Sequence, residues 1–419
     1  MAGLSIANGI DKAKLTCLAD GLIVAVAVSL PWSTSVTAIL VVIWLFALIP
    51  TIRWTDIRRE VTGPAGGLPV LLVALGLAGM LWADVTLLER WWGFESFLKL
   101  LVIPLLFVQY RRSNHGEWVF AGYLSSCVAL LAATTVVMAI PSIAAGLMRH
   151  DDVLVKSAAT QSGEFVTCIF GLLFLLSEAA KRRRWLWQLV FVAIILTMLA
   201  NMLYVATGRT ALITIPVLLV LFASKKLSAK GAVLVATGAL LVGIVVWTSS
   251  PYLRDRTTQI WTDFEKYEAT DERTSSGERI EFWKKSIEFI RQSPLIGHGT
   301  GSIHSLFEKA AAGRTATAGV AAANPHNQTL AVAIQLGFVG VAVLWAMWIA
   351  HLLLFRGNGL AEWIGLVIVV QNIVGSLFNS HLFDFVQGWA YVVGVGVAGG
   401  IAMKSCTIDG IPDATAKPK

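Results

Sequence analysis

The sequence predicts an all-α membrane protein, a polytopic bundle of about twelve transmembrane helices with one large polar loop. Hydrophobic residues make up 56% of the 419-residue chain, only 14% are charged, and the mean hydropathy is +0.71. A soluble domain cannot bury that much apolar surface, so lipid must solvate the excess. Because backbone polar groups inside a bilayer must pair within the chain, only helix bundles and closed barrels fit. Long uninterrupted apolar runs, such as 231–247, favour helices.

Apolar windows of bilayer-crossing length recur along the chain, each placed to within about four residues. We expect the first window to be a retained helix, because it lacks a small-residue cleavage site and leads directly into a second window. An even number of spans places both termini on the same side of the membrane. The windows are 15–32, 34–51, 67–83, 94–109, 117–140, 161–180, 185–205, 209–223, 231–248, 326–350, 359–378 and 385–403.

Basic residues in the short connections lie mostly on one side of the predicted bundle. The positive-inside rule makes that side cytoplasmic, so both termini are expected in the cytoplasm of a bacterial inner-membrane protein. The formal net charge of +7 therefore reflects topology, and we assign no nucleic-acid partner. The cytoplasmic set is Lys12, Lys14, Arg53, Arg58, Arg59, Arg111, Arg112, Lys181, Arg182, Arg183, Arg184, Lys225, Lys226, Lys230, Arg356 and Lys404.

One connection is much longer than the others. It is a polar stretch of about 75 residues, long enough for a small subdomain on the outer, periplasmic face, and we expect the function to reside there. The predicted organisation is transmembrane helices one to nine over 1–248, the periplasmic loop over 249–325, helices ten to twelve over 326–403 and a cytoplasmic tail over 404–419.

The loop itself reads as helical pieces. We predict one helix over 252–267 and a second that begins with the capping box Ser275-x-x-Glu278 and ends before Pro294. A flexible turn, 297–302, follows; it is either a hinge or a backbone nest for phosphate. The second helix is expected to carry Ile280, Trp283, Ile287 and Ile290 on one face, which suits a helix that lies along the membrane surface with its aromatic residue at headgroup depth.

His326 is the candidate catalytic residue, because it lies where the loop re-enters the membrane. A partly desolvated imidazole suits a general base near neutral pH. The alternative is a residue at a helix N-terminus that makes a capping contact.

Two arginines are candidate anion ligands. Arg209 lies at the outer end of two apolar spans, where an arginine either snorkels to the interface or binds an anion. Arg279 is, taken alone, equally a charge on a solvated helix face. Arg254 adds to a cationic excess in the loop that an anionic substrate explains.

Other polar residues are candidates for supporting roles. His298 flanks the glycine-rich turn, and Asp384, in the short outer turn before the last span, is within reach of the same outer region. Because no ligand set stands at a recognisable spacing, we expect no catalytic metal, and the 4 cysteines suggest no disulfide framework.

The order of these motifs resembles the O-antigen ligase and polymerase superfamily, most closely its ligase branch. The resemblance rests on Gly208-Arg209-Thr210, then Ser276-Gly277-x-Arg279 with Trp283, then the segment from Pro294 to Gly299, and finally His326-Asn327 followed by Gln335-Leu336-Gly337-Phe338-x-Gly340. At the residue level it covers about 207–340, and the twelve-span topology extends it over most of the chain.

The resemblance implies a metal-independent, inverting glycosyltransferase of the integral-membrane type. Such an enzyme takes a glycan from undecaprenyl pyrophosphate and, in the ligase branch, attaches it to the outer core sugar of lipid A-core at the periplasmic face. It implies that His326 is the essential loop histidine and that Arg209 and Arg279 are the two essential arginines. Because the donor is already activated, neither ATP nor another cofactor is expected; the expected partners are the lipid-linked glycan, lipid A-core and membrane lipids.

Two kinds of alternative stay open at this stage. An O-antigen polymerase and a protein O-oligosaccharyltransferase share the same loop motifs. A transporter or flippase also fits twelve spans, although it should carry charged or helix-breaking residues deep within several of them.

Overall fold

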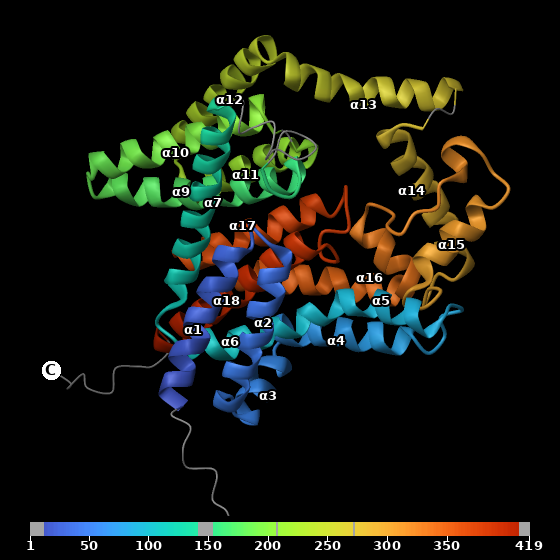
Figure 1. Cartoon of the computed structure of the whole chain (residues 1–419). Coiled ribbons are helices and arrows are strands. Elements are labelled where there is room, and N and C mark those ends of the chain that lie inside the picture. The colour runs from blue at the N-terminus through green and yellow to red at the C-terminus, as the bar shows by residue number, and fades with distance from the viewer. Residues whose placement is uncertain (1–11, 141–153, 207, 271–272, 410–419) are drawn as a thin grey trace, which may run out of the picture.

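The computed structural model describes residues 12–140, 154–206, 208–270 and 273–409 and is all-helical over these ranges (Figure 1). Eight helical segments among them are long and apolar enough to cross a membrane. They are α2–η2 (Thr34–Leu48 and Ile49–Thr51), α5–η3–α6 (Leu87–Leu98, Lys99–Leu101 and Val102–Arg112), α7 (Gly116–Ala139), α9 (Ala158–Lys181), α10 (Trp185–Tyr204), α12 (Ala229–Ser249), α16 (Gln328–Leu354) and the stretch to Ser405 of α18 (Phe385–Asp409).

The predicted all-α membrane fold is confirmed, whereas the count of twelve spans is not. Each of the four remaining windows is a helix that length or charge sets apart. α4 (Pro64–Gly79) qualifies only together with α3 (Trp54–Thr62), from which it is bent by 91°, so the pair is a ninth candidate. α1 (Lys12–Ser29) and α11 (Arg209–Lys226) each include several charged residues, and α17 (Leu360–Gly375) has only 16 residues.

Two apolar cores hold the bundle together. The larger one joins α1, α2, α4, α6, α16 and α18 around fully buried rings such as Trp44, Phe107 and Tyr391. The second joins α7, α9, α10 and α11 to Trp363 of α17. Because α17 contributes to both cores, it fixes the two parts of the bundle relative to each other.

The polar loop folds into three α-helices and a short 3-10 turn. α13 (Pro251–Thr270) runs along one side of the molecule and leads to α14 (Ser275–Gln292), and α15 (Ser302–Ala311) and η4 (Ala316–Gly319) follow (Figure 1). α14 and α15 both pack on α16. Of the predicted cytoplasmic tail, residues up to 409 continue α18, and 410–419 lie outside the described residues.

The capping box predicted for α14 is wrong. Its N-cap is Thr274, whose side chain accepts a hydrogen bond from the Gly277 backbone, so Ser275 does not begin a capping box. The buried face of α14 carries Phe282 and Phe289, with Ile290 partly buried against the same core, whereas Ile287 is 46% exposed. Both phenylalanines pack edge-on against Phe307 of α15, at ring-centre distances of 5.5 and 5.2 Å, and this contact sets the rotation of the helix.

The glycine-rich turn docks onto two membrane helices through its backbone. The amides of His298 and Gly299 donate to carbonyls of α16, and the Thr300 amide donates to Gly79 of α4. The Gly301 amide donates to the side chain of Gln335. Because the protein itself occupies these amides, the turn is a structural joint, and the phosphate-nest interpretation fails.

We expect Gly299→Ala to destabilise the protein by more than the roughly 1–2 kcal/mol that a left-handed conformation alone costs a residue with a Cβ. Gly299 has φ +89°, and an added Cβ would lie 2.5 Å from the backbone of Ala83. Gly313→Ala is the matched control, because Gly313 has φ +73° but open space around it. Thermal unfolding of the detergent-solubilised variants measures the difference. Equal melting temperatures would contradict the docking role.

Candidate active site

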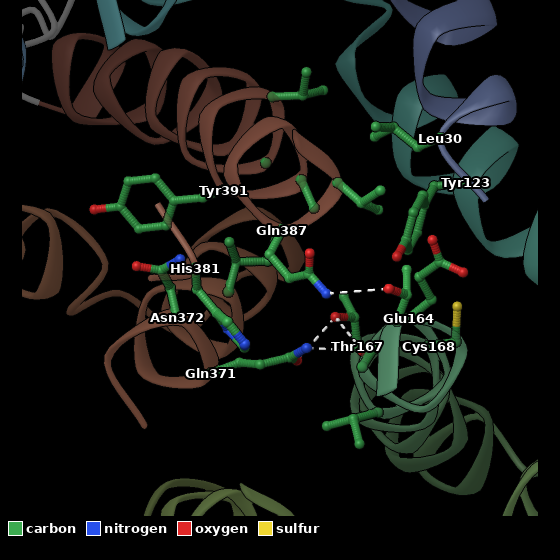
Figure 2. Close-up of a pocket in the computed structure, with 18 of the residues that line it drawn as sticks. Leu30, Tyr123, Glu164, Thr167, Cys168, Gln371, Asn372, His381, Gln387 and Tyr391 are labelled. Carbon is green, nitrogen blue, oxygen red and sulfur yellow. Dashed lines mark hydrogen bonds between the residues drawn. The ribbon is translucent and has the colours of Figure 1, made fainter. Parts of the chain in front are cut away.

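A cavity of about 640 Å³ lies between α7, α9, α17 and α18 and reaches the folded loop. Arg279 of α14 and His326, just before α16, both line it, although they are 47 positions apart in the sequence. Figure 2 shows Gln371 and Gln387 extending from α17 and α18 toward α9 within this cavity. The structure therefore brings two of the three principal site candidates to one cavity.

His326 is held in a strained turn by its neighbours. Its φ is +53°, in the left-handed region that residues other than glycine seldom adopt. The side chain of Asn324 accepts a 2.8 Å hydrogen bond from the His326 backbone, which stabilises this conformation. Asn327 is the N-cap of α16. His326 is therefore not the capping residue of the alternative interpretation, and its side chain is available for another role.

The turn between α17 and α18 is fastened to the start of α16. The side-chain oxygen of Gln328 accepts hydrogen bonds from the Leu382 and Phe383 backbone amides, at 2.9 and 3.3 Å. The backbone amide of Gln328 donates to the carbonyl of Ser376. Lys99 of η3 donates to two carbonyls of the same turn. These bonds bring Asn379 to His326, where its Oδ1 lies 3.1 Å from the imidazole Nδ1.

Arg279 presents an uncompensated positive charge to the cavity. It is half-buried on α14, and within the described residues its guanidinium has no hydrogen-bond or ion-pair partner. Burial and the nearby charge of Arg209 both lower the pKa of Arg279, although an arginine stays protonated at neutral pH. An anion in the cavity would relieve both unfavourable effects.

Arg209 reaches the same region from the first residue of α11. The preceding Gly208 packs closely on α9: a Cβ added to it would lie 3.0 Å from the Cα of Ala159. Its backbone amide donates to the hydroxyl of Ser162, and this bond fixes the start of α11. The Arg209 guanidinium donates to Ser275 of α14 at 3.2 Å. It therefore lies at the N-terminus of the helix that carries Arg279, beside the cavity and not among its lining residues.

The imidazole of His326 sits in an environment that favours its neutral form. Burial is the largest cause of its lowered pKa, and the charge of Arg279 lowers it further. The hydrogen bond to Asn379 and the charge of Glu278 act in the opposite direction. Because the net shift is downward, His326 is neutral at neutral pH and available to accept a proton.

The three supporting candidates separate in space. Asp384 lines the cavity, and its carboxylate accepts hydrogen bonds from the Val386 and Gln387 backbones at the start of α18. His298 lies elsewhere, since its Nε2 donates to the Phe289 carbonyl at 2.8 Å and so caps α14. Arg254 is exposed near the start of α13, away from the cavity lining.

The cavity wall also holds polar residues that the sequence analysis did not select. Glu164 of α9 is only 5% exposed, and its carboxylate lies 3.6 Å from the Lys156 amine. The Gln387 side chain donates to Thr160 at 3.5 Å, and Gln371 forms hydrogen bonds to α9. A carboxylate within an apolar span is itself a signal of function, and Glu164 could have been found from it.

Acidic, histidine and cysteine side chains form no cluster of three or more suited to a metal ion within the described ranges. The buried histidine His351 bonds Tyr391 and the Ala65 carbonyl inside the bundle core, and His115 bonds the carboxylate of Asp20. Both are thus engaged in packing contacts between helices.

Comparison with known proteins matches this part of the chain to one family. Residues 193–345, which include Arg209, Arg279 and His326, match the family described as O-antigen ligase. A protein of Haemophilus influenzae named "Uncharacterized protein" is 26% identical over 158 residues, a match that covers 37% of this chain and 40% of that protein.

We expect Arg279→Gln to raise the pKa of His326, because the substitution removes a positive charge that disfavours the imidazolium. NMR titration of histidine-labelled protein in nanodiscs measures the value, with the His326 signal assigned by its loss in His326→Gln. Lys309→Gln is the control, because Lys309 of α15 pairs with Asp84 and does not line the cavity. An unchanged or lowered pKa in Arg279→Gln would contradict the electrostatic coupling.

Proposed function

Because the chain belongs to the O-antigen ligase and polymerase superfamily, we propose that it is an O-antigen ligase. In this proposal it transfers the glycan of an undecaprenyl-pyrophosphate donor to the outer core sugar of lipid A-core, with inversion and without a metal ion. The observation that carries the proposal is the shared cavity: it is lined both by an imidazole in its neutral form and by a guanidinium without a partner in the described structure.

Two guanidiniums suit a diphosphate leaving group. Arg279 faces the cavity, and Arg209 lies near enough for its charge to act on Arg279. Forked donors bind phosphate oxygens in pairs, and they stabilise the negative charge that grows as the glycosidic bond to the diphosphate breaks. Two like charges in a half-buried place are unfavourable alone, so a dianionic ligand is the natural complement.

The transfer step needs only one proton acceptor. The hydroxyl oxygen of the acceptor sugar attacks the anomeric carbon while His326 takes the hydroxyl proton. The bond between that carbon and the diphosphate oxygen breaks, and its electron pair leaves with the diphosphate, which the two arginines hold. Attack from the face opposite the leaving group inverts the anomeric centre. The free energy comes from the activated donor.

The cavity lining is mostly apolar, but it includes a group of polar side chains beside Glu164 that could bind a saccharide. Thr167, Gln371 and Gln387 line the cavity there (Figure 2). Thr160, which accepts a hydrogen bond from Gln387, adds a further hydroxyl group. Such groups are the usual hydrogen-bonding partners for a polyhydroxylated ligand, and the volume of about 640 Å³ lies within the range of small-molecule sites.

The distribution of charge supports a periplasmic site in the inner membrane. In the proposed topology, the loop over 249–325, which carries Arg279, lies on the side opposite the short basic connections, and His326 follows it directly in the sequence. The positive-inside rule then puts the site outside the cytoplasm and both termini inside it. A lipid-linked donor in the outer leaflet reaches this site without crossing the bundle.

The ligase, the polymerase and the protein O-oligosaccharyltransferase differ in the acceptor that receives the glycan. A polymerase elongates a second lipid-linked glycan, and a protein O-oligosaccharyltransferase modifies a hydroxyl-bearing side chain. Purified protein given lipid-linked glycan and either lipid A-core or a second donor, with a chelator present, distinguishes these reactions by product. Capped lipid A-core formed in the chelator supports the proposal; elongated donor alone, or a strict metal requirement, refutes it.

We expect His326→Ala to lower kcat by roughly 10²–10⁴-fold, the usual contribution of a general base, while the protein still inserts into the membrane. Gel analysis of reconstituted transfer measures the rate. The matched control is His304→Ala, because His304 is exposed on α15 and does not line the cavity. Normal capping by His326→Ala would remove the catalytic assignment.

We expect Arg209→Lys and Arg279→Lys to restore little of the activity that the alanine variants lose, because an ammonium is a point charge and cannot make a forked contact. Arg254→Lys should leave the rate unchanged, since Arg254 is exposed and away from the cavity lining. Donor titrations of each variant give KM and kcat. Full activity in both lysine variants would argue against paired phosphate contacts.

A further inference from the structure

We propose that Asn379, held by Asn324, is the positioning residue that fixes the neutral tautomer of His326 and leaves Nε2 as the atom that accepts the proton. The proposal rests on the function proposed above, and it names which imidazole nitrogen acts and what selects it. Three consecutive hydrogen bonds select this tautomer, because each atom in them can act only as a donor or only as an acceptor.

The first bond fixes the orientation of Asn324. A backbone N–H can only donate, and that of His326 lies 2.8 Å from one side-chain atom of Asn324. This atom is therefore the carbonyl oxygen Oδ1. The hydroxyl of Ser380 donates to the same oxygen at 2.7 Å, which agrees with the assignment. The other terminal atom of Asn324 must then be the amide nitrogen.

The second bond fixes the orientation of Asn379. The amide nitrogen of Asn324 can only donate, and it lies 3.0 Å from a side-chain atom of Asn379. That atom must be the oxygen Oδ1. Asparagine oxygen and nitrogen are otherwise hard to tell apart, but here a main-chain donor settles both amides in sequence.

The third bond selects the tautomer. The same Oδ1 of Asn379 lies 3.1 Å from Nδ1 of His326, and an oxygen that can only accept requires a proton on Nδ1. A neutral imidazole carries one proton, so Nε2 keeps its lone pair. Nε2 has no hydrogen-bond partner within the described part of the chain, and the ring lines the cavity.

The arrangement also supports the imidazole after it has taken up the proton. Once Nε2 is protonated, Nδ1 still donates to Asn379, so no bond breaks during proton transfer. The ring is further restrained by Phe282, which stacks with it at a ring-centre distance of 6.1 Å and an interplanar angle of 20°. The amide of Asn379 thus plays the orienting part that a carboxylate plays in hydrolase triads, without adding a negative charge near the donor diphosphate.

Packing alone does not explain Asn379. The turn that carries it is already anchored by Gln328 and Lys99, so a residue there is not needed to hold α16 and α18 together. Asn379 instead directs its oxygen at two donors, one of which is the candidate base. Leucine has the same branched arrangement of side-chain heavy atoms but no oxygen, so Asn379→Leu removes this acceptor from both donors.

The test is ¹⁵N NMR of the full-length, histidine-labelled protein in nanodiscs at a pH where His326 is neutral. We expect the His326 signal, identified by its loss in His326→Gln, to show a protonated Nδ1 and a free Nε2. In Asn379→Leu this preference should disappear, whereas Asn379→Asp, which keeps the acceptor, should retain it. Gln387→Leu is the matched control: it removes another amide of the same cavity and should leave the tautomer unchanged.

Kinetics provide the second measurement. Asn379→Leu should lower kcat by about 10–100-fold, the usual loss when an orienting partner is removed, with little change in the KM for the donor. Asn379→Asp should recover much of that loss. A merely structural role predicts no such rescue and no change of tautomer.

The outcomes separate this inference from the proposed function. A protonated Nε2 in the wild type, or an Asn379→Leu variant that keeps Nδ1 protonated, overturns the role of Asn379 even if transfer is observed. If the wild type transfers no glycan but its tautomer responds to Asn379 as expected, the proposed function fails and the orientation of His326 stands. If the leucine variant fails to fold, the wild-type spectrum still shows which nitrogen carries the proton, and Asn379→Asp still tests whether an acceptor oxygen at this position keeps it there.

Discussion

The hydrogen bonds that join the start of α16 to the turn between α17 and α18 hold the candidate site together. Gln328 binds two backbone amides of that turn, and Asn379 on the same turn meets His326. Leu382 and Gln328 are both buried, and a buried backbone donor must be paired, so the Gln328 side chain satisfies the Leu382 amide. The same requirement that stabilises the turn therefore also places the imidazole, and the site is a consequence of how the membrane fold closes.

Charge is the second constraint. Arg279 lines the cavity with no acidic partner among the described residues, and the neighbouring Arg209 adds a second positive charge. Glu164 of α9 also lines the cavity, but it is paired with Lys156, which precedes that helix, and so does not neutralise the arginines. The polar wall suits hydroxyl groups and the cationic edge suits phosphate, which together describe a sugar diphosphate. The electrostatics and the hydrogen-bonding capacity of the cavity thus support the same class of substrate.

The sequence predicts the fold class well, because apolar windows of bilayer length have few alternatives. Every predicted window is a helix, but some of these helices are too short or carry too many charges to qualify on their own as membrane spans. The buried face of α14 could not be predicted, since contacts with Phe307, distant in sequence, set its rotation. The glycines from 297 to 301 look like a phosphate nest until the structure pairs their amides with α4 and α16. Local pattern does not reveal which partner a backbone group finds.

Some residues of the site were predictable from the sequence and others were not. His326 and Arg279 stand out because each lies beside a motif, and the structure places both on the cavity. Asn379 carries no signal in the sequence, since an asparagine in a short turn is ordinary and its partner is 53 positions away. The glycines around His298 indicated a supporting role in the site, yet its side chain caps α14. Tertiary contacts decide these roles, and only they distinguish an orienting amide from a turn residue.

A structure of the protein with its lipid-linked glycan donor bound tests the central claim most directly. The account predicts a diphosphate within hydrogen-bonding distance of both Arg209 and Arg279, with the anomeric carbon of the first sugar turned toward the cavity face of His326. A diphosphate bound elsewhere, or a donor sugar separated from His326 by the width of the cavity, would contradict it.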